Sequence, residues 1–192
     1  MKFPVFDLHC DTATSLLGSS LRQCGSLKNN NGHIDLDRAS DLQGYAQCFA
    51  CCTSTLDTRI PPVELFERQL ASVMREVEKD DRIAMAYSAD DVEENYKAGR
   101  MSAILTLEGP AGIDFDPELL HDIYMVGYRM STLGWNESNP LCGSHLTGEG
   151  LTEQGMLYVK TAQELGMMVD LSHISDAAFW DIVQLTEKPL IA

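Results

Sequence analysis

Basic residues and long apolar runs are both scarce in this sequence. Its 14 Lys and Arg stand against 29 Asp and Glu, which gives a net charge of -15. Such a surface repels phosphate backbones, so we expect no nucleic-acid partner. No apolar run reaches the roughly 18 residues that a membrane-spanning helix needs, so we expect no membrane span. The first residues, MKFPVFDLHCDT, lack the apolar core of a secretion signal, and without a removed leader the expected location is cytoplasmic.

Nucleotide-binding and zinc-finger motifs are absent as well. The sequence contains no glycine-rich dinucleotide turn after its first apolar run, no P-loop, and no two C-x-x-C pairs at zinc-finger spacing. Cys48 and Cys51 have C-x-x-C spacing, but they lie in AQCFACC, which is typical of a buried strand, whereas a redox motif opens a helix. We therefore expect buried structural thiols without disulfides; the other cysteines are Cys10, Cys24, Cys52 and Cys142.

Short apolar runs alternate with longer amphipathic stretches along the chain. With 44% hydrophobic and 22% charged residues, we expect one soluble globular domain over residues 1–192. Strands are predicted at 5–10, 46–52, 102–109, 128–135 and 167–173, with another beginning at 189–192. Helices are predicted at 34–42, 61–79, 88–99, 116–127, 151–166 and 175–188, a long loop at 136–150, and a strand or the approach to a helix at 83–88. Pro61 and Pro62 open the second helix, and Ser88, Thr152 and Ser175 are expected to cap the third, fifth and sixth.

This alternation predicts an α/β fold in which helices cover a parallel sheet. The strands are apolar on both faces, as buried parallel strands are. The sheet is either an open doubly wound sheet or a closed (β/α) barrel. A glycine-rich turn after the first strand would favour the open sheet, but that strand ends in HCDT.

Three of the predicted strands end in residues that bind metals, and the carboxyl ends of the strands are where a (β/α) barrel carries its active site. The first ends in His9 and Asp11, and two-residue spacing places both on one face of a strand. Two others end in Glu108 and His173. Imidazole nitrogen and carboxylate oxygen are ligands of a borderline metal such as Zn²⁺. Each residue alone has an ordinary structural explanation, but agreement at three strand ends favours a metal site.

Three further residues have open roles. Asp170 lies three residues before His173, on the other face of that strand, either behind a metal ligand or as a structural carboxylate. Asp7 shares a face with His9 but lies deeper in the strand, so we do not expect it to be a ligand. His145 lies in the long loop and is a weak candidate to reach the site.

Segments in the order DLHCDT, GHIDLDRA, YAQCF, LTLEG, WNESNPLCGS, GLTEQG and GMMVDLSHIS together resemble the renal (membrane) dipeptidase family, the M19 metallopeptidases. The segments extend across the whole chain and are specific as a set. The resemblance implies a (β/α)8 TIM-type barrel of the metal-dependent hydrolase kind. It also implies two bound zinc ions and the hydrolysis of dipeptides.

The resemblance gives each candidate ligand a role. His9 and Asp11 match ligands of the first zinc, His173 matches a ligand of the second, and Glu108 matches the catalytic carboxylate that bridges both. Two such ions would lower the pKa of a bridging water and stabilise the oxyanion formed from the peptide carbonyl. The best-studied members have a substrate-binding His where this chain has Trp135, which is either a substrate contact or a packing residue under the loop.

The resemblance also implies that the site is incomplete. In the family, the strand that begins like KPLIA continues into Ser-His-Ser, whose His completes the second zinc, whereas this chain ends at Ala192. A barrel of about 250 residues is typical, so the chain corresponds to the N-terminal part of one barrel domain, about five or six of eight strands. We expect a metallo-dipeptidase as the full-length protein and little or no activity from the 192 residues alone.

Two alternatives remain open at this point. One is a related amidohydrolase that acts on another small amide, because substrate choice depends largely on loops and on the later strands. The other is a non-catalytic or metal-binding fragment of the fold. Because an incomplete barrel exposes sheet edges, we expect the isolated chain to form a homodimer, to aggregate, or to need its missing part.

Overall fold

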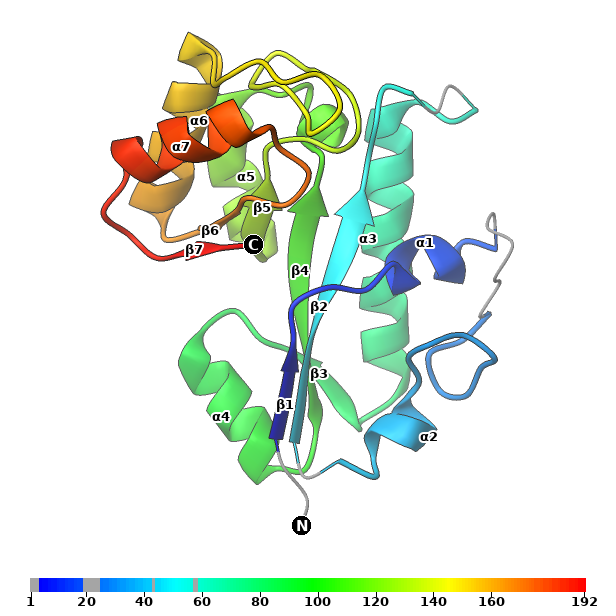
Figure 1. The fold of residues 1–192 in the computed structure, drawn as a ribbon. Helices are drawn as coiled ribbons and strands as arrows, with labels where there is room; N and C mark the ends of the chain where they lie inside the picture. The colour runs from blue at the N-terminus through cyan, green and yellow to red at the C-terminus, as the bar shows by residue number, and fades with distance from the viewer. Residues whose placement is uncertain (1–3, 19–24, 43, 57–58) are drawn as a thin grey trace. The chain divides into compact units, whose positions relative to one another are not determined.

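The computed structural model describes residues 4–18, 25–42, 44–56 and 59–192 (Figure 1). The chain divides into two compact units, one formed by Met1–Cys51 and Glu67–Thr106, the other by Cys52–Phe66 and Leu107–Ala192. Both units contain parallel strands connected by helices, which confirms the predicted α/β class. Among the described helices, none combines the length and the apolar character needed to cross a membrane.

The strands of the first unit are β1 (Pro4–Asp7), β2 (Gly44–Cys52), β3 (Ile83–Met85) and most of β4 (Met101–Glu108). β2 lies between β1 and β4, and β3 pairs with β4. β1 runs parallel to β2 and β3 runs parallel to β4. Phe49 and Cys51 in β2 are fully buried and Cys48 is 2% exposed, so this segment is the predicted buried strand. Cys24 lies outside the described residues.

Four helices belong wholly or largely to the first unit: α1 (Thr12–Leu16), α2 (Leu36–Ala39), α3 (Pro62–Lys79) and α4 (Ala89–Lys97). α3 begins with a proline, as predicted, because the first helical position needs no N–H donor. The predicted Ser88 cap of α4 is confirmed, since its hydroxyl accepts the Asp91 N–H at 3.1 Å. α1 was not predicted, because one and a half turns are too short to show a helical period.

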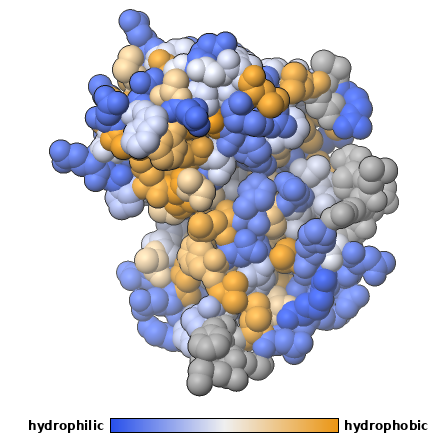
Figure 2. Space-filling view, viewed as in Figure 1, coloured by the Kyte–Doolittle hydropathy of each residue, from blue (hydrophilic) through white to orange (hydrophobic). Residues whose placement is uncertain are grey.

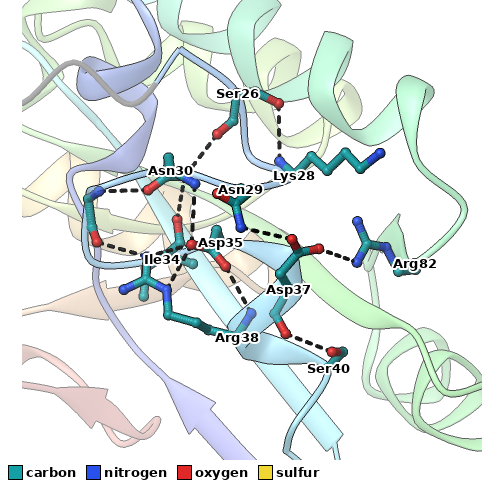
Figure 3. Close-up of polar contacts among 11 residues, drawn as sticks. Ser26, Lys28, Asn29, Asn30, Ile34, Asp35, Asp37, Arg38, Ser40 and Arg82 are labelled. Atoms are coloured by element: carbon teal, nitrogen blue, oxygen red, sulfur yellow. Dashed lines mark hydrogen bonds and ion pairs between the residues drawn. The ribbon is translucent and has the colours of Figure 1, made fainter.

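Polar side chains hold the segment that leads into α2 (Figure 3). The Asp35 carboxylate is 2% exposed and accepts the Arg38 backbone N–H and its Nε, both at 2.8 Å. Burial opposes ionisation of Asp35, but the Arg38 hydrogen bonds outweigh it, so the pKa of Asp35 lies below its ordinary value. Asn30 donates to the carbonyl oxygens of Ser26 and Ile34 at 2.8 and 2.9 Å. These polar groups satisfy one another and so stabilise the segment.

Apolar side chains are exposed on β1 and directly after it, at Leu8. Val5 is 38%, Phe6 53% and Leu8 39% exposed, and Figure 2 shows hydrophobic atoms on the surface over this strand. A hollow of about 420 Å³ lies beside them, with Val92 and Tyr96 of α4 in its wall. Exposed apolar strand residues favour association. The expected homodimer stays a prediction, as does the single barrel domain over residues 1–192.

The second unit contains β5 (Tyr128–Thr132), β6 (Met168–Asp170) and β7 (Leu190–Ile191), which run parallel in that order. Its helices are α5 (Leu120–Val126), α6 (Glu153–Leu165) and α7 (Asp176–Leu185), with 3-10 turns η1 (Pro110–Ile113) and η2 (Pro117–Leu119). α5 packs on β5 and α6 on β6 (Figure 1). The largest fully buried side chains include Tyr128, Leu133, Leu141, Tyr158 and Ile182.

Several strands end earlier than the sequence predicts, which places site residues on turns. β1 ends at Asp7, so His9 and Asp11 lie beyond it, and Asp11 is the N-cap of α1. Strand alternation predicts His9 and Asp11 on one face of a strand. That prediction is wrong, because both lie after the strand, in the turn before α1. β6 likewise ends at Asp170, three residues before His173. Glu108 is the last residue of β4, as predicted.

Candidate metal centre

His9 and Asp11 form a donor pair in the turn between β1 and α1. Their Nε2 and Oδ1 atoms are 3.4 Å apart, and the side chains are 46% and 74% exposed. The Asp7 carboxylate accepts the His9 backbone N–H at 3.2 Å. The carbonyl of Cys10 accepts the Ala50 N–H of β2 at 3.1 Å, which anchors the turn. Two donor side chains are therefore presented to solvent from a turn that is attached to the sheet.

Cys10 lies between these two residues and is 9% exposed. Burial raises the pKa of the Cys10 thiol to about 11. The thiol therefore stays protonated and uncharged at neutral pH, and a protonated thiol is a poor metal ligand. This agrees with the prediction that Cys10 is a buried structural thiol.

Glu108 and His173 form a second donor pair in the other unit. The His173 Nε2 lies 3.1 Å from Oε1 of Glu108, with the side chains 30% and 6% exposed respectively. The carboxylate is almost enclosed, while the imidazole lines the surface. A buried carboxylate is expensive unless a cation or hydrogen-bond donor compensates its charge. Here the His173 imidazole or a bound cation can compensate the charge of Glu108.

The backbone around Glu108 is held by two threonines that sequence reasoning did not single out. Thr53 donates its N–H to the Glu108 carbonyl at 2.9 Å and its hydroxyl to the Gly109 carbonyl. The Thr132 hydroxyl accepts the Gly109 N–H at 2.8 Å. Thr53 follows β2 and Thr132 ends β5, so the peptide after Glu108 is fixed from two directions. Nothing in the sequence links these positions, because they are neighbours only in the folded unit.

His173 is held in a conformation that L-residues rarely adopt. Its φ is 69°, in the left-handed region. Its carbonyl accepts the His145 N–H at 2.9 Å, and the Nδ1 of His145 lies 3.3 Å from the same oxygen. An antiparallel bridge joins Ser144 to Ile174. The long loop at 136–150 therefore binds the turn that carries His173 through these hydrogen bonds, and they compensate for the unfavourable φ.

The donor spacing in both pairs fits metal coordination. Two ligands of one tetrahedral zinc, each about 2.0–2.1 Å from the ion, lie about 3.3 Å apart. The His9–Asp11 separation is 3.4 Å and the Glu108–His173 separation is 3.1 Å. Each pair combines one imidazole nitrogen with one carboxylate oxygen, which are ligands that zinc accepts. Each unit therefore presents one pair of donors suited to a divalent ion.

Two aromatic rings lie beside His173. The centroid of the Trp135 ring is 6.4 Å from the His173 ring, and that of His145 is 6.2 Å away. Trp135 is therefore close enough to line a site built on His173, and His145 is nearer than sequence reasoning expected. Asp170 accepts the Ser172 N–H at 2.9 Å and is 6% exposed, which indicates a structural role in the turn. His121 is exposed on α5, beside Asp122.

Glu137 is a functional candidate that sequence reasoning missed. Its Oε1 accepts hydrogen bonds from Ser54 and Thr55, which follow β2. The sequence signal is weak, because one acidic residue in a loop rich in Asn, Gly and Ser is most simply a solvated surface group. Its importance depends on contacts between segments that are far apart in the chain.

Comparison with known proteins places the chain in a family. The family model for membrane dipeptidases, peptidase family M19, matches residues 1–192. Dipeptidase verJ of Clonostachys rogersoniana is 27% identical over 98% of this chain and 53% of its own length. The chain thus spans about half the length of this curated relative.

Solved structures agree with this assignment. The crystal structure of dipeptidase AC, a metallopeptidase of family M19, matches the whole chain with a TM-score of 0.86 and 27% identity, over 63% of that protein. A metallopeptidase from Rhodobacter sphaeroides, crystallised with a phosphinate mimic of L-Ala-D-Ala, gives a TM-score of 0.86 at 24% identity, over 65% of its length. These likenesses confirm the predicted fold class, part of a TIM-type barrel. The chain belongs to the membrane dipeptidase family, peptidase family M19.

Proposed function

We propose that the protein is a zinc-dependent dipeptidase that cleaves the peptide bond of dipeptides. The observation that carries this proposal is the Glu108–His173 pair, whose 3.1 Å separation and enclosed carboxylate suit a metal ion, in a chain of a metallopeptidase family. The His9–Asp11 pair supplies a second set of donors. The dipeptide substrate is proposed from the family and from the relatives that bear the name dipeptidase.

Each residue has a defined task in this proposal. His9 and Asp11 would hold one ion and His173 the other, and Glu108 would be a ligand of both and the catalytic carboxylate. Two zinc ions at these donors would supply Lewis acidity that activates a water at neutral pH and polarises the substrate carbonyl. The Thr53 and Thr132 hydrogen bonds fix the peptide that carries Glu108, so the carboxylate needs little rearrangement to bind.

Trp135 is proposed to contact the substrate. Its ring lies 6.4 Å from the ring of His173, within the range of aromatic contacts, so it borders the same surface as this candidate ligand. An aromatic face offers apolar contact and excludes water from the scissile bond. Holding the dipeptide in this way would favour the correct approach to the metal-binding residues.

The test is metal analysis and hydrolysis assays on the full-length gene product. We expect two divalent ions per chain and release of free amino acids from dipeptides. His9→Ala and His173→Ala should each lower metal content and abolish turnover, because each removes a ligand. His121→Ala is the matched control, an exposed helix histidine whose loss should leave both unchanged.

Three results would contradict the proposal. Fewer than one bound divalent ion per chain would exclude a two-metal site. Turnover that survives His9→Ala would remove that residue from the mechanism. Hydrolysis of acylated amino acids or lactams without cleavage of any dipeptide would make the protein an amidohydrolase of another specificity.

A further inference from the structure

We propose that Glu137 is a positioning residue that holds Trp135 beside His173 and thereby sets the affinity for substrate. The inference rests on the proposed dipeptidase function for its kinetic readout. Its structural basis is a set of hydrogen bonds from Ser54 and Thr55, in the segment after β2, to Glu137, in the loop after β5. We call this set the Glu137 tie.

The tie consists of three hydrogen bonds to one carboxylate oxygen. Oε1 of Glu137 accepts from the Ser54 hydroxyl at 2.6 Å, from the Thr55 N–H at 3.0 Å and from the Thr55 hydroxyl at 3.3 Å. Hydrogen bonds to a carboxylate are stronger than those between neutral groups. The Ser54 hydroxyl in turn accepts the Leu56 N–H at 3.0 Å, so the donor side is itself ordered.

The Glu137 side chain is partly buried at this junction. Ser54 is 7% exposed, and Oε2 of Glu137 is inaccessible to solvent, with no hydrogen-bond partner among the described residues. A carboxylate without a structural role on a surface loop would have both oxygens hydrated. Here one oxygen is buried and the other accepts three hydrogen bonds. This indicates that the side chain joins the loop after β5 to the segment after β2.

The same short segment contacts the candidate metal ligand. Thr53, which precedes Ser54, holds the carbonyls of Glu108 and Gly109. Trp135 packs on this peptide, since a Cβ placed on Gly109 would lie 3.7 Å from the Trp135 Cβ. Residues 53–55 therefore bind the strand end that carries Glu108 on one side and the loop of Trp135 on the other.

The consequence is a fixed distance between Trp135 and the metal-binding pair. Glu137 is two residues after Trp135, so a shift at Glu137 moves the tryptophan backbone directly. The ring of Trp135 is tilted by 49° to that of His173 at 6.4 Å, and no hydrogen bond between the two rings maintains this geometry among the described contacts. We infer that the Glu137 tie maintains it.

The kinetic test compares variants of two glutamates in the same loop. Glu137→Leu removes the acceptor at similar volume and should raise KM about tenfold with kcat within about twofold, because substrate is misplaced while the metal ligands stay. Glu137→Gln keeps an acceptor oxygen and should give an intermediate KM. Glu149→Leu is the control, since the Glu149 carboxylate accepts from Ser138 and makes no hydrogen bond to residues 53–55 among the described contacts. Metal content should be unchanged in all three variants.

Repeating the comparison in a Trp135→Ala protein distinguishes positioning of Trp135 from a general loss of stability. If Glu137 acts through Trp135, then Glu137→Leu should change KM little in a Trp135→Ala protein. An equal rise in KM in both backgrounds, or an unchanged KM in Glu137→Leu, would overturn the proposal. Wild-type protein that cleaves no dipeptide would instead overturn the proposed function.

Fluorescence provides a readout that does not need activity. The chain has two tryptophans, Trp135 and Trp180, so Trp180→Phe leaves one reporter. In that background, Glu137→Leu should increase quenching of Trp135 by acrylamide, and Glu149→Leu should not. Equal quenching in the parent and in Glu137→Leu would show that the tie does not hold Trp135.

Discussion

Gly109 is the residue whose backbone most directly secures the candidate ligand before it. Its φ is 74°, and a Cβ built there would lie 2.4 Å from the Thr53 carbonyl oxygen. The Thr53 and Thr132 hydrogen bonds hold this peptide in place. A glycine is therefore required for two separate reasons, its left-handed φ and the close approach of another backbone.

These two reasons can be separated experimentally by two substitutions. Gly99 has a φ of 69° and no atom within 4 Å of its would-be Cβ, so Gly99→Ala should cost about 1 kcal/mol for the conformation alone. Gly109→Ala should cost about 3 kcal/mol, because the clash is added, and it should also lower metal affinity. Urea unfolding and metal titration measure both effects. Equal destabilisation by the two substitutions would show that the close approach is relieved without cost.

The residue types at the candidate site could be predicted from the sequence, but the backbone contacts that hold these residues in place could not. His9, Asp11, Glu108 and His173 are recognisable because they follow apolar strands and carry the donor atoms that metals bind. The left-handed φ of His173 has no local sequence signal, since glycine or asparagine is the usual residue there. That conformation is maintained by contacts from a loop distant in sequence.

The helices illustrate what local rules predict at the scale of an element. Ser88, Thr152 and Ser175 were predicted as N-caps of α4, α6 and α7, and each side chain accepts a backbone N–H of the first turn. Capping involves residues within four positions, so it can be predicted from sequence. Strand ends were less predictable, because a strand continues only as far as its neighbour pairs with it.

The N-terminus of α2 provides a prediction at this scale. Asp35 caps the helix and binds Arg38, so Asp35→Ala should lower the free energy of unfolding by about 2 kcal/mol at pH 7. Because the pKa of Asp35 is lowered below 3.8 in the folded state, its ionic contribution is present above that pH. It should be lost as the pH falls below that value.

Urea unfolding at pH 7 and at about pH 2.5 measures this dependence. Asp35→Asn keeps a capping acceptor without the charge. The difference in the free energy of unfolding between this variant and the wild type should therefore be smaller at about pH 2.5, where more of the wild-type Asp35 is protonated. Asp41→Ala, an exposed carboxylate in the same region, is the control and should have little effect. A destabilisation by Asp35→Asn that is independent of pH would contradict an ionic contribution from Asp35.

At the scale of the whole molecule, metal binding should couple to stability. Ligands that bind only the folded state raise its stability, by about 2.7 kcal/mol at a concentration one hundred times the dissociation constant. Removing metal with a chelator should therefore lower Tm by about 5–10 °C for a chain of this size.

Calorimetry with and without chelator tests this coupling, and readdition of zinc should restore Tm. Zinc-saturated chelator is the control for effects of the chelator itself. A Tm that does not respond to metal removal would contradict the proposed ligands, since ions bound by His9, Asp11, Glu108 and His173 would be released on unfolding.

The sequence by itself determined the α/β class, the capped starts of α4, α6 and α7, the family and the identity of the candidate donors. Each depends on periodicity, on capping within one turn, or on the order of short motifs. Only the tertiary structure decided that Glu108 meets His173 and that Glu137 meets Ser54 and Thr55. The reason is physical: contacts between distant segments depend on strand order and on backbone turns, which no local pattern of residues specifies.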